Sequence, residues 1–140
     1  MSDSAEKVRI LSALLADDLR QESTGLQSLI GIYPRRLESA DTKFQVWKLV
    51  CRIEFESEED FTGNCGFALI NPRGVQMLGG PPTPVGIKKS LTNIFAFGWG
   101  PVVFNDPGTY KLNFTINEKT WTVLEFKVVL AGNDGSGPAA

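Results

Sequence analysis

The chain has 140 residues and a formal net charge of −2, with 42% hydrophobic and 21% charged residues. A chain of this length and composition buries enough apolar surface for one core, which excludes wholesale disorder. Its 14 basic and 16 acidic residues nearly balance, which excludes a strong field for a polyanion, so we expect no nucleic-acid partner. The sequence contains no histidine, which removes the usual general base and metal ligand and disfavours an enzyme.

The amino-terminal segment is polar and acidic. Residues 1–6 read MSDSAE, where a secretory signal carries basic residues and then an apolar run. No apolar stretch reaches the length that a transmembrane helix needs. We therefore expect a cytoplasmic protein with no membrane partner.

Residues 8–33 are ambiguous between helix and strand. Apolar side chains in 8–19 recur at helical spacing behind Ser4, which is a helix-capping residue type. Residues 26–33 favour a strand through Ile30, Ile32 and Tyr33. If the first segment is also a strand, the two form a hairpin across residues 17–25.

Residues 44–55 alternate between apolar and polar side chains, which predicts a half-buried strand with Trp47 and Cys51 in its apolar phase. A polar loop then leads to a second strand, 65–70, with Cys65 in its apolar phase. If these strands form a hairpin, both thiols face the core and lie near each other. Two cysteines are too few for a disulfide framework and have the wrong spacing for a zinc knuckle, so we interpret them as buried free thiols, with a redox pair or regulatory disulfide as the alternative.

Turn signals divide the middle of the chain. Residues 71–74, Asn-Pro-Arg-Gly, are typical of a β-turn. Residues 79–84 hold three prolines and two glycines, which predicts an irregular bridge. Residues 91–99 and 102–104 are apolar and are separated by a bend, bulge or strand switch.

The last part of the chain contains the clearest hairpin. After a turn at 105–108, four apolar side chains point to one side of a strand: Tyr110, Leu112, Phe114 and Ile116. Residues 121–130 then return as the partner of this strand. These patterns predict an all-β protein, a single two-layer antiparallel β-sandwich domain over residues 1–130, immunoglobulin-like, with about seven to nine strands. Residues 131–140 have nothing to bury and are expected to form a flexible C-terminal tail.

Residues 13–22 (ALLADDLRQE), Gly25 and residues 28–33 (SLIGIY) resemble the opening of an uncharacterised family of small bacterial and phage β-sandwich proteins, a domain of unknown function. Residues 102–110 (VVFNDPGTY) resemble its closing portion. The opening of that family is a strand, a polar connection and a second strand, so the resemblance implies strand for residues 8–19. It implies no activity, because a fold does not define a function.

The leading candidate surface site is a polar patch within the segment that carries the resemblance. Its residues are the ones that a core explains least: Asp17, Asp18, Arg20, Gln21 and Glu22. We interpret them as an interaction patch for a protein partner. The alternative is that they pair with one another and order a turn.

A second candidate site combines an aromatic residue with basic ones for ligand binding: Arg35, Arg36, Arg73 and Trp99. An aromatic face stacks on a base while guanidinium groups bind phosphate, provided that the fold brings them together. The alternative is that the aromatic residues belong to the core. The acidic residues of 56–60 offer oxygen ligands for a hard cation, but they lack the register of a calcium loop, so we predict no metal site.

We expect a non-catalytic binding or protein-interaction module of bacterial or phage origin. It would present loops or an exposed strand edge to a protein partner, or to a second copy in a homodimer. The alternative is a small-ligand, nucleotide-type or cation-binding protein that uses the end loops of the sandwich. An enzyme that uses carboxylates or lysine alone comes third, and no cofactor is expected.

Overall fold

The structure is a computed structural model that describes residues 4–24 and 26–136. Apart from one short 3-10 helix, the regular structure of these residues is all β-strand, which confirms the predicted all-β class, and the twelve strands exceed the number expected. A short 3-10 helix, Ser4–Lys7, comes first. The strands are β1 (Val8–Gln21), β2 (Gln27–Ile32), β3 (Arg36–Ser39), β4 (Phe44–Val46), β5 (Leu49–Ser57), β6 (Phe61–Ile70), β7 (Gln76–Gly79), β8 (Thr83–Ile87), β9 (Asn93–Trp99), β10 (Val102–Phe104), β11 (Gly108–Ile116) and β12 (Lys119–Leu130).

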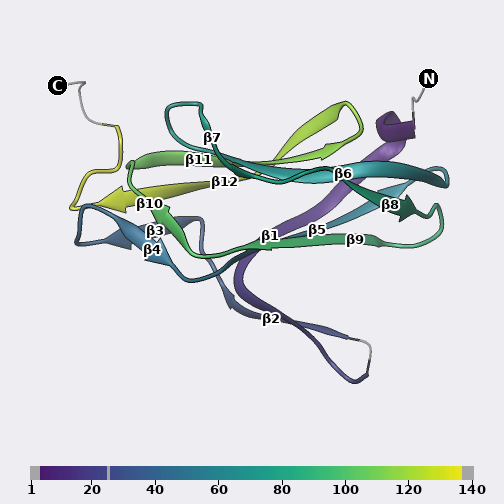
Figure 1. Cartoon of the computed structure of the whole chain (residues 1–140), viewed down its shortest axis with the longest axis horizontal. Helices are drawn as coiled ribbons and strands as arrows, with labels where there is room; N and C mark the ends of the chain where they lie inside the picture. Colours follow the sequence, from purple (N-terminus) through teal and green to yellow (C-terminus); the bar gives the residue numbers. More distant parts are fainter. Residues whose placement is uncertain (1–3, 25, 137–140) are drawn as a thin grey trace.

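Two sheets pack face to face, which confirms the predicted two-layer sandwich (Figure 1). One sheet has the strand order β2-β1-β5-β9. The other has the order β3-β12-β11-β6-β7, with β8 also paired to β6, and β4 and β10 form a separate short pair. Among the described residues, the strand pairs are antiparallel, as predicted, except that β3 runs parallel to β12. Parallel pairing requires a long connection, and most of the chain lies between these two strands. The immunoglobulin-like topology stays a prediction.

The ambiguous amino-terminal segment is a strand. β1 pairs antiparallel with β5 and, further along, with β2, so the predicted hairpin is also confirmed. A bulge between Ile10 and Ser12 shifts the register and leaves Leu11 42% exposed. The bulge changes which face the apolar side chains occupy, and this change gave the segment its helix-like spacing.

The core lies between the two sheets. In β11 the predicted alternation is confirmed, because Tyr110, Leu112, Phe114 and Ile116 are all buried. The ring of Phe114 lies 5.6 Å from Phe55 of the opposite sheet and 5.3 Å from Phe67 of its own sheet, centroid to centroid. Aromatic contacts of this kind bury a large apolar area, so this cluster joins the two layers.

The strand expected over residues 44–55 is interrupted at Trp47 and Lys48. β4 pairs with β10 before the interruption, whereas β5 pairs with β1 and β9 after it. Trp47 lies between these pairings and is 79% exposed. Its assignment to the buried, apolar phase was therefore wrong.

The two cysteines come from opposite sheets. β5 and β6 belong to different sheets, so these strands do not form a hairpin, and residues 58–60 cross from one layer to the other. Cys51 and Cys65 are nevertheless free thiols with fully buried side chains, as predicted. Burial raises the pKa of both thiols, that of Cys65 to about 11.

The turn at residues 71–74 is confirmed, with Gly74 at a φ of +79°. Of the bend, bulge or strand switch expected at residues 98–101, the structure has a strand switch: β9 belongs to one sheet, and β10 pairs with β4 beyond a cis Gly100–Pro101 bond. The irregular bridge is shorter than predicted. β8 begins at Thr83 and contains Pro84, which an edge strand tolerates because it needs fewer backbone donors there.

The chain turns back on itself after β12, where Asn133 pairs with Leu130. The predicted flexibility of the tail beyond residue 136 lies outside the described residues. Within the described ranges, no helix is long and apolar enough to span a bilayer.

Candidate functional site

The far end of β1 and strand β2 form a hairpin that projects from the body of the sandwich (Figure 1). We call its described residues, 17–24 and 26–32, the arm. In the part of the chain that the structure describes, β2 pairs with β1 alone, so the other edge of β2 is open. An open edge leaves backbone N–H and C=O groups that can pair with a further strand.

The predicted polar patch lies on the arm. Asp18 accepts hydrogen bonds from Lys48 Nζ at 2.7 Å and from Arg20 Nε at 3.3 Å. These contacts hold the pKa of the Asp18 carboxyl below its ordinary value, and the contact with Lys48 has the largest effect. Asp18 is thus a link between the arm and the residues that precede β5.

The other members of the patch also have partners within or beside the arm. Glu22 accepts a hydrogen bond from Ser28 Oγ at 2.7 Å, and Asp17 accepts one from the Tyr33 hydroxyl at 3.3 Å. Gln21 lies opposite Gln27 in the β1–β2 register. The structure therefore brings the five predicted residues onto one hairpin, and their contacts match the alternative in which they order that hairpin.

Apolar side chains on the same arm are exposed. Leu26, Ile30 and Ile32 are 70%, 39% and 54% exposed. Exposed apolar residues that cluster on one element mark interaction surfaces more often than scattered ones do. Sequence analysis named the polar residues of this segment and missed this property.

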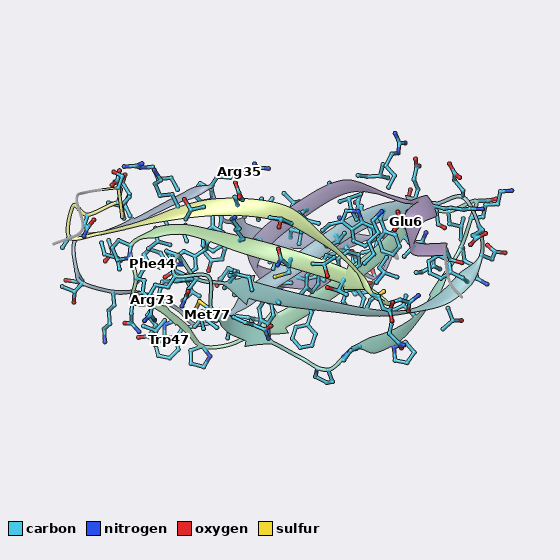
Figure 2. The ribbon with its side chains drawn as sticks, turned by 90° about the horizontal axis from the view of Figure 1, so that it is seen from above. Glu6, Arg35, Phe44, Trp47, Arg73 and Met77 are labelled. Carbon is cyan, nitrogen blue, oxygen red and sulfur yellow. The ribbon has the colours of Figure 1, made fainter. Side chains whose placement is uncertain are left out.

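A shallow hollow of about 510 Å³ joins the arm to the interruption between β4 and β5. We call it the Trp47 hollow. Its lining combines arm residues with aromatic ones: Asp17, Gly31, Ile32, Tyr33, Phe44, Gln45, Val46 and Trp47. The side chain of Trp47 stands at the surface, at the lower edge of the molecule in Figure 2. Desolvation by the surrounding residues, together with Asp17, raises the pKa of Tyr33.

A sequence signal for this hollow exists. Val46 and Val50 break the alternation on either side of Trp47, and both are buried. Two such breaks four residues apart indicate an irregularity in the strand near Trp47, but they do not identify the strands that pair on either side of it.

The four residues of the second candidate site lie apart. Arg36 lies on β3, which is an edge strand of the six-stranded sheet, and it forms an ion pair with Glu38. Arg35 is the residue directly before β3. Arg73 is in the turn before β7, the other edge of that sheet, and Figure 2 shows Arg35 and Arg73 on opposite sides of the molecule. Trp99 is part of the aromatic cluster. Its ring lies 5.4 Å from that of Phe97 and its Nε1 donates to the carbonyl of Gly79. This arrangement gives the nucleotide-type site no support.

The acidic residues after β5 have local partners. Glu56 pairs with Arg9, Glu59 lies 3.5 Å from Lys7 Nζ, and Asp60 accepts the backbone N–H of Lys89. Among the described residues, no three side chains of His, Cys, Asp or Glu gather as a metal site would require.

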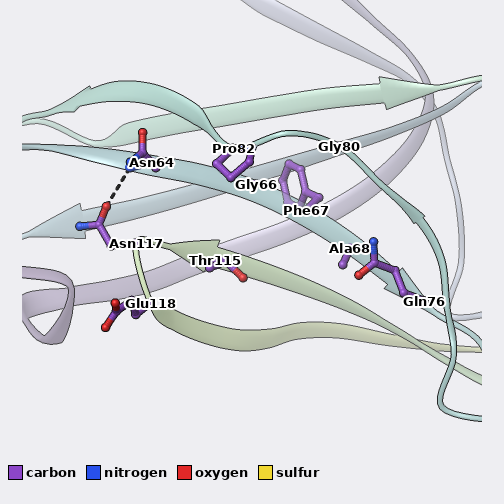
Figure 3. A pocket seen from close by; sticks show the side chains of 10 residues that line it. All are labelled: Asn64, Gly66, Phe67, Ala68, Gln76, Gly80, Pro82, Thr115, Asn117 and Glu118. Carbon is purple, nitrogen blue, oxygen red and sulfur yellow. Dashed lines mark hydrogen bonds between the residues drawn. The ribbon is translucent and has the colours of Figure 1, made fainter.

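A deeper groove of about 500 Å³ lies on the other sheet (Figure 3). It runs over β6, and apart from Phe67 its lining residues are small or polar: Asn64, Gly66, Phe67, Ala68, Gln76, Gly80, Pro82, Thr115, Asn117 and Glu118. Sequence analysis did not predict this groove, because its walls come from segments that meet only in the folded chain.

The fold and these surfaces define the chain as an all-β sandwich with an open-edged arm. It belongs to a family of unknown function, DUF6941, whose sequence profile matches residues 11–129. No curated protein matches the chain.

The comparison with solved structures gives matches at low sequence identity. The chain is similar to the Pseudomonas fluorescens alkylpurine DNA glycosylase AlkC bound to DNA containing an abasic site analogue, with a TM-score of 0.53 and 10% identity. That match covers 88% of this chain and 30% of the glycosylase chain. A second match is the C-terminal domain of Wzt, with a TM-score of 0.45 and 13% identity over 87% of this chain and 66% of that one. At identities this low, the likeness to the glycosylase concerns the fold alone.

Proposed function

We propose that the chain is a non-catalytic interaction module that binds a protein partner through the arm. The partner supplies an extended segment that pairs with the open edge of β2 and places an apolar side chain in the Trp47 hollow. Strand addition of this kind takes its affinity from main-chain hydrogen bonds and its specificity from pockets for alternate side chains.

The observation that carries the proposal is the position of Trp47. It is 79% exposed and shares a hollow with Ile32, the last residue of the open-edged strand. Tryptophan is among the residues that dominate interface energies, because it buries a large area with few side-chain rotamers to restrict. An exposed tryptophan beside an unpaired edge therefore fits a surface that a partner covers.

The carboxylates support a role without catalysis. Among the described residues, the carboxyl groups whose pKa departs from the ordinary value are those of Asp18, Glu59 and Asp134, and local partners lower the pKa of each. A general acid that works near neutral pH needs a raised carboxyl pKa, which is the opposite direction.

The proposal can be tested with three variants of the full chain. Trp47→Ala removes the aromatic anchor, and Ile32→Lys places a charge on the β2 edge. Leu91→Ala is the matched control, because Leu91 is 63% exposed and lies next to β9 at the opposite end of β5 from Trp47. Each immobilised protein is used to capture partners from a lysate of the source organism, and a captured partner is then purified for hydrogen exchange.

We expect a partner that the wild type and Leu91→Ala retain and that the other two variants lose. In the purified complex, the amides of residues 26–32 should gain protection. A partner that protects the amides of other strands from hydrogen exchange, or that binds Trp47→Ala and the wild type with equal affinity, would overturn the proposal. The proposal would also be overturned if no partner is captured and light scattering shows a monomer. If light scattering instead shows a dimer that Trp47→Ala and Ile32→Lys disrupt, the partner is a second copy of the chain.

A further inference from the structure

We propose that the groove over β6 is a binding site for a neutral, hydroxyl-rich ligand of the saccharide class. The groove lies on the six-stranded sheet, and the arm belongs to the other sheet, so this inference is independent of the proposed function. Its volume of about 500 Å³ falls within the range of small-molecule sites.

The groove exists because β6 changes partner along one edge. β8 pairs with Phe61–Cys65 and β7 pairs with Ala68–Ile70, so Gly66 and Phe67 lie between the two partners. The connection through Gly80 and Pro82 passes over this gap and forms one wall (Figure 3). The turn between β11 and β12 forms the other wall.

The floor of the groove is made of small residues. Phe67 and Phe114 face the core, so their neighbours Gly66 and Thr115 face outward, as the two-residue period of a strand requires. Gly66 and Ala68 keep the floor low and expose backbone and methyl groups. Together with the ring of Pro82 they provide a C–H surface, which suits the apolar face of a sugar ring.

The walls carry groups that both donate and accept hydrogen bonds. Asn117 Oδ1 accepts the backbone N–H of Asn64 at 2.9 Å, which fixes this amide at the wall and keeps its Nδ2 group as a donor (Figure 3). At the other end, Gln76 Nε2 lies over Gly79, only 2.3 Å from where a Cβ on that glycine would stand. Amide side chains match pairs of adjacent hydroxyl groups, because an amide group and a hydroxyl group both donate and accept hydrogen bonds.

The charge of the lining selects against anions. Among the ten lining residues, all within the described ranges, Glu118 is the one charged side chain. A phosphate or carboxylate ligand would meet this negative charge without a compensating cation. A neutral diol instead donates two hydrogen bonds to a carboxylate.

Gly66 offers a direct way to close the groove. Its backbone φ is not in the left-handed region, and a Cβ built there meets a single neighbour, Pro82 Cα, at 3.9 Å. There is room for a Cβ at this position, so Gly66→Val adds side-chain volume to the floor with a residue that strands favour. Gly86→Val is the matched control, because a Cβ on Gly86, in β8, meets nothing within 4 Å.

The test is an amide NMR titration of the full chain with glucose, galactose, mannose, N-acetylglucosamine, maltose and cellobiose. Glucose 6-phosphate and inorganic phosphate serve as anionic probes. We expect saturable shifts with a neutral sugar at the amides of residues 64–68 and 117–118. These shifts should persist in Gly86→Val and vanish in Gly66→Val.

Three results would overturn the inference: no saturable shift with any neutral sugar, shifts that survive Gly66→Val, or tighter binding of the phosphorylated probe. If Gly66→Val does not fold, Glu118→Ala replaces it, because Glu118 is exposed in a turn and its loss removes an acceptor from the wall. Unchanged sugar binding in Glu118→Ala would then also contradict the assignment.

Discussion

Lys48 Nζ donates to Asp18 Oδ1 at 2.7 Å and so ties the base of the arm to the interruption between β4 and β5. Lys48 follows Trp47 directly, so the contact also joins the arm to the residue that we propose as the anchor. Both side chains are partly exposed, at 52% for Lys48 and 27% for Asp18. We expect this ion pair to position the arm more than to stabilise the fold, because exposed pairs contribute little to stability.

Lys48→Met should raise the pKa of the Asp18 carboxyl toward its ordinary value. In the folded protein that pKa is lowered, so the contribution of Lys48 to stability is present above the ordinary carboxyl pKa and is lost as the pH falls through the lowered one. Carbon-detected NMR titration of the carboxyl group measures the shift. Lys43→Met, an exposed lysine in the preceding loop, should leave the titration unchanged, and an equal shift in both variants would contradict the assignment.

Trp47, which is exposed, and Trp99, which is half-buried, should respond differently to truncation. Trp47→Ala should change the free energy of unfolding by less than about 0.5 kcal/mol, because the side chain has little packing to lose. Trp99→Ala should cost about 3 kcal/mol, because its ring packs against Phe67 and Phe97. Urea denaturation of both variants measures the difference. A large loss in Trp47→Ala would mean that this residue is structural and would weaken its role as an anchor.

The buried thiols predict a loss of stability at alkaline pH. Burial raises the pKa of the Cys51 thiol, and it raises the pKa of the Cys65 thiol to about 11. As the pH rises, the two thiols therefore stay protonated in the folded state at pH values where they ionise in the unfolded chain. The unfolded state then binds fewer protons, and the free energy of unfolding falls as the pH rises above the ordinary thiol pKa of about 8.5. Urea denaturation between about pH 8 and pH 10 measures this slope. The double variant Cys51→Ala, Cys65→Ala should flatten it, and an unchanged slope would assign it to other groups.

The Tyr110 hydroxyl donates to the carbonyl of Asp106 at 2.7 Å, and burial raises its pKa to about 12. Tyr110→Phe should lower the free energy of unfolding by about 1 kcal/mol, the usual worth of such a hydrogen bond. Tyr33→Phe is the comparison, because the hydroxyl of Tyr33 has longer contacts of 3.3 and 3.4 Å and should cost less. Urea denaturation of the two variants tests this order, and a larger loss in Tyr33→Phe would reverse it.

Strand positions with one buried face could be predicted from the sequence. The alternation of Tyr110 to Ile116 predicted the buried side chains correctly, because a hairpin that covers the core must keep this register. The strand nature of β1 could not be derived from its own spacing, since the bulge near Ile10 disturbs the period. The resemblance of residues 13–33 to a β-sandwich family resolved that case.

Changes of partner could not be predicted. The pattern of residues 44–55 is compatible with one strand, and the interruption at Trp47 follows from the pairing of β4 with β10, which local periodicity does not contain. The same reason applies to Cys51 and Cys65, whose strands join different sheets across a short loop. The groove over Gly66 likewise depends on the pairing of β6 with β8 along one part of its length and with β7 along another. The candidate site therefore lies where long-range pairing overrides local pattern.

The β11–β12 hairpin lies between β3 and β6 in the larger sheet. β3 and β6 come much earlier in the chain, so that sheet has no continuous ladder until the hairpin inserts between them. Pairs such as Leu37 with Val128 join distant parts of the sequence, and such closures are slow because the entropy of a long loop is lost before the contacts form. We expect the smaller sheet to form first and the larger sheet to close in the final, rate-limiting step of folding.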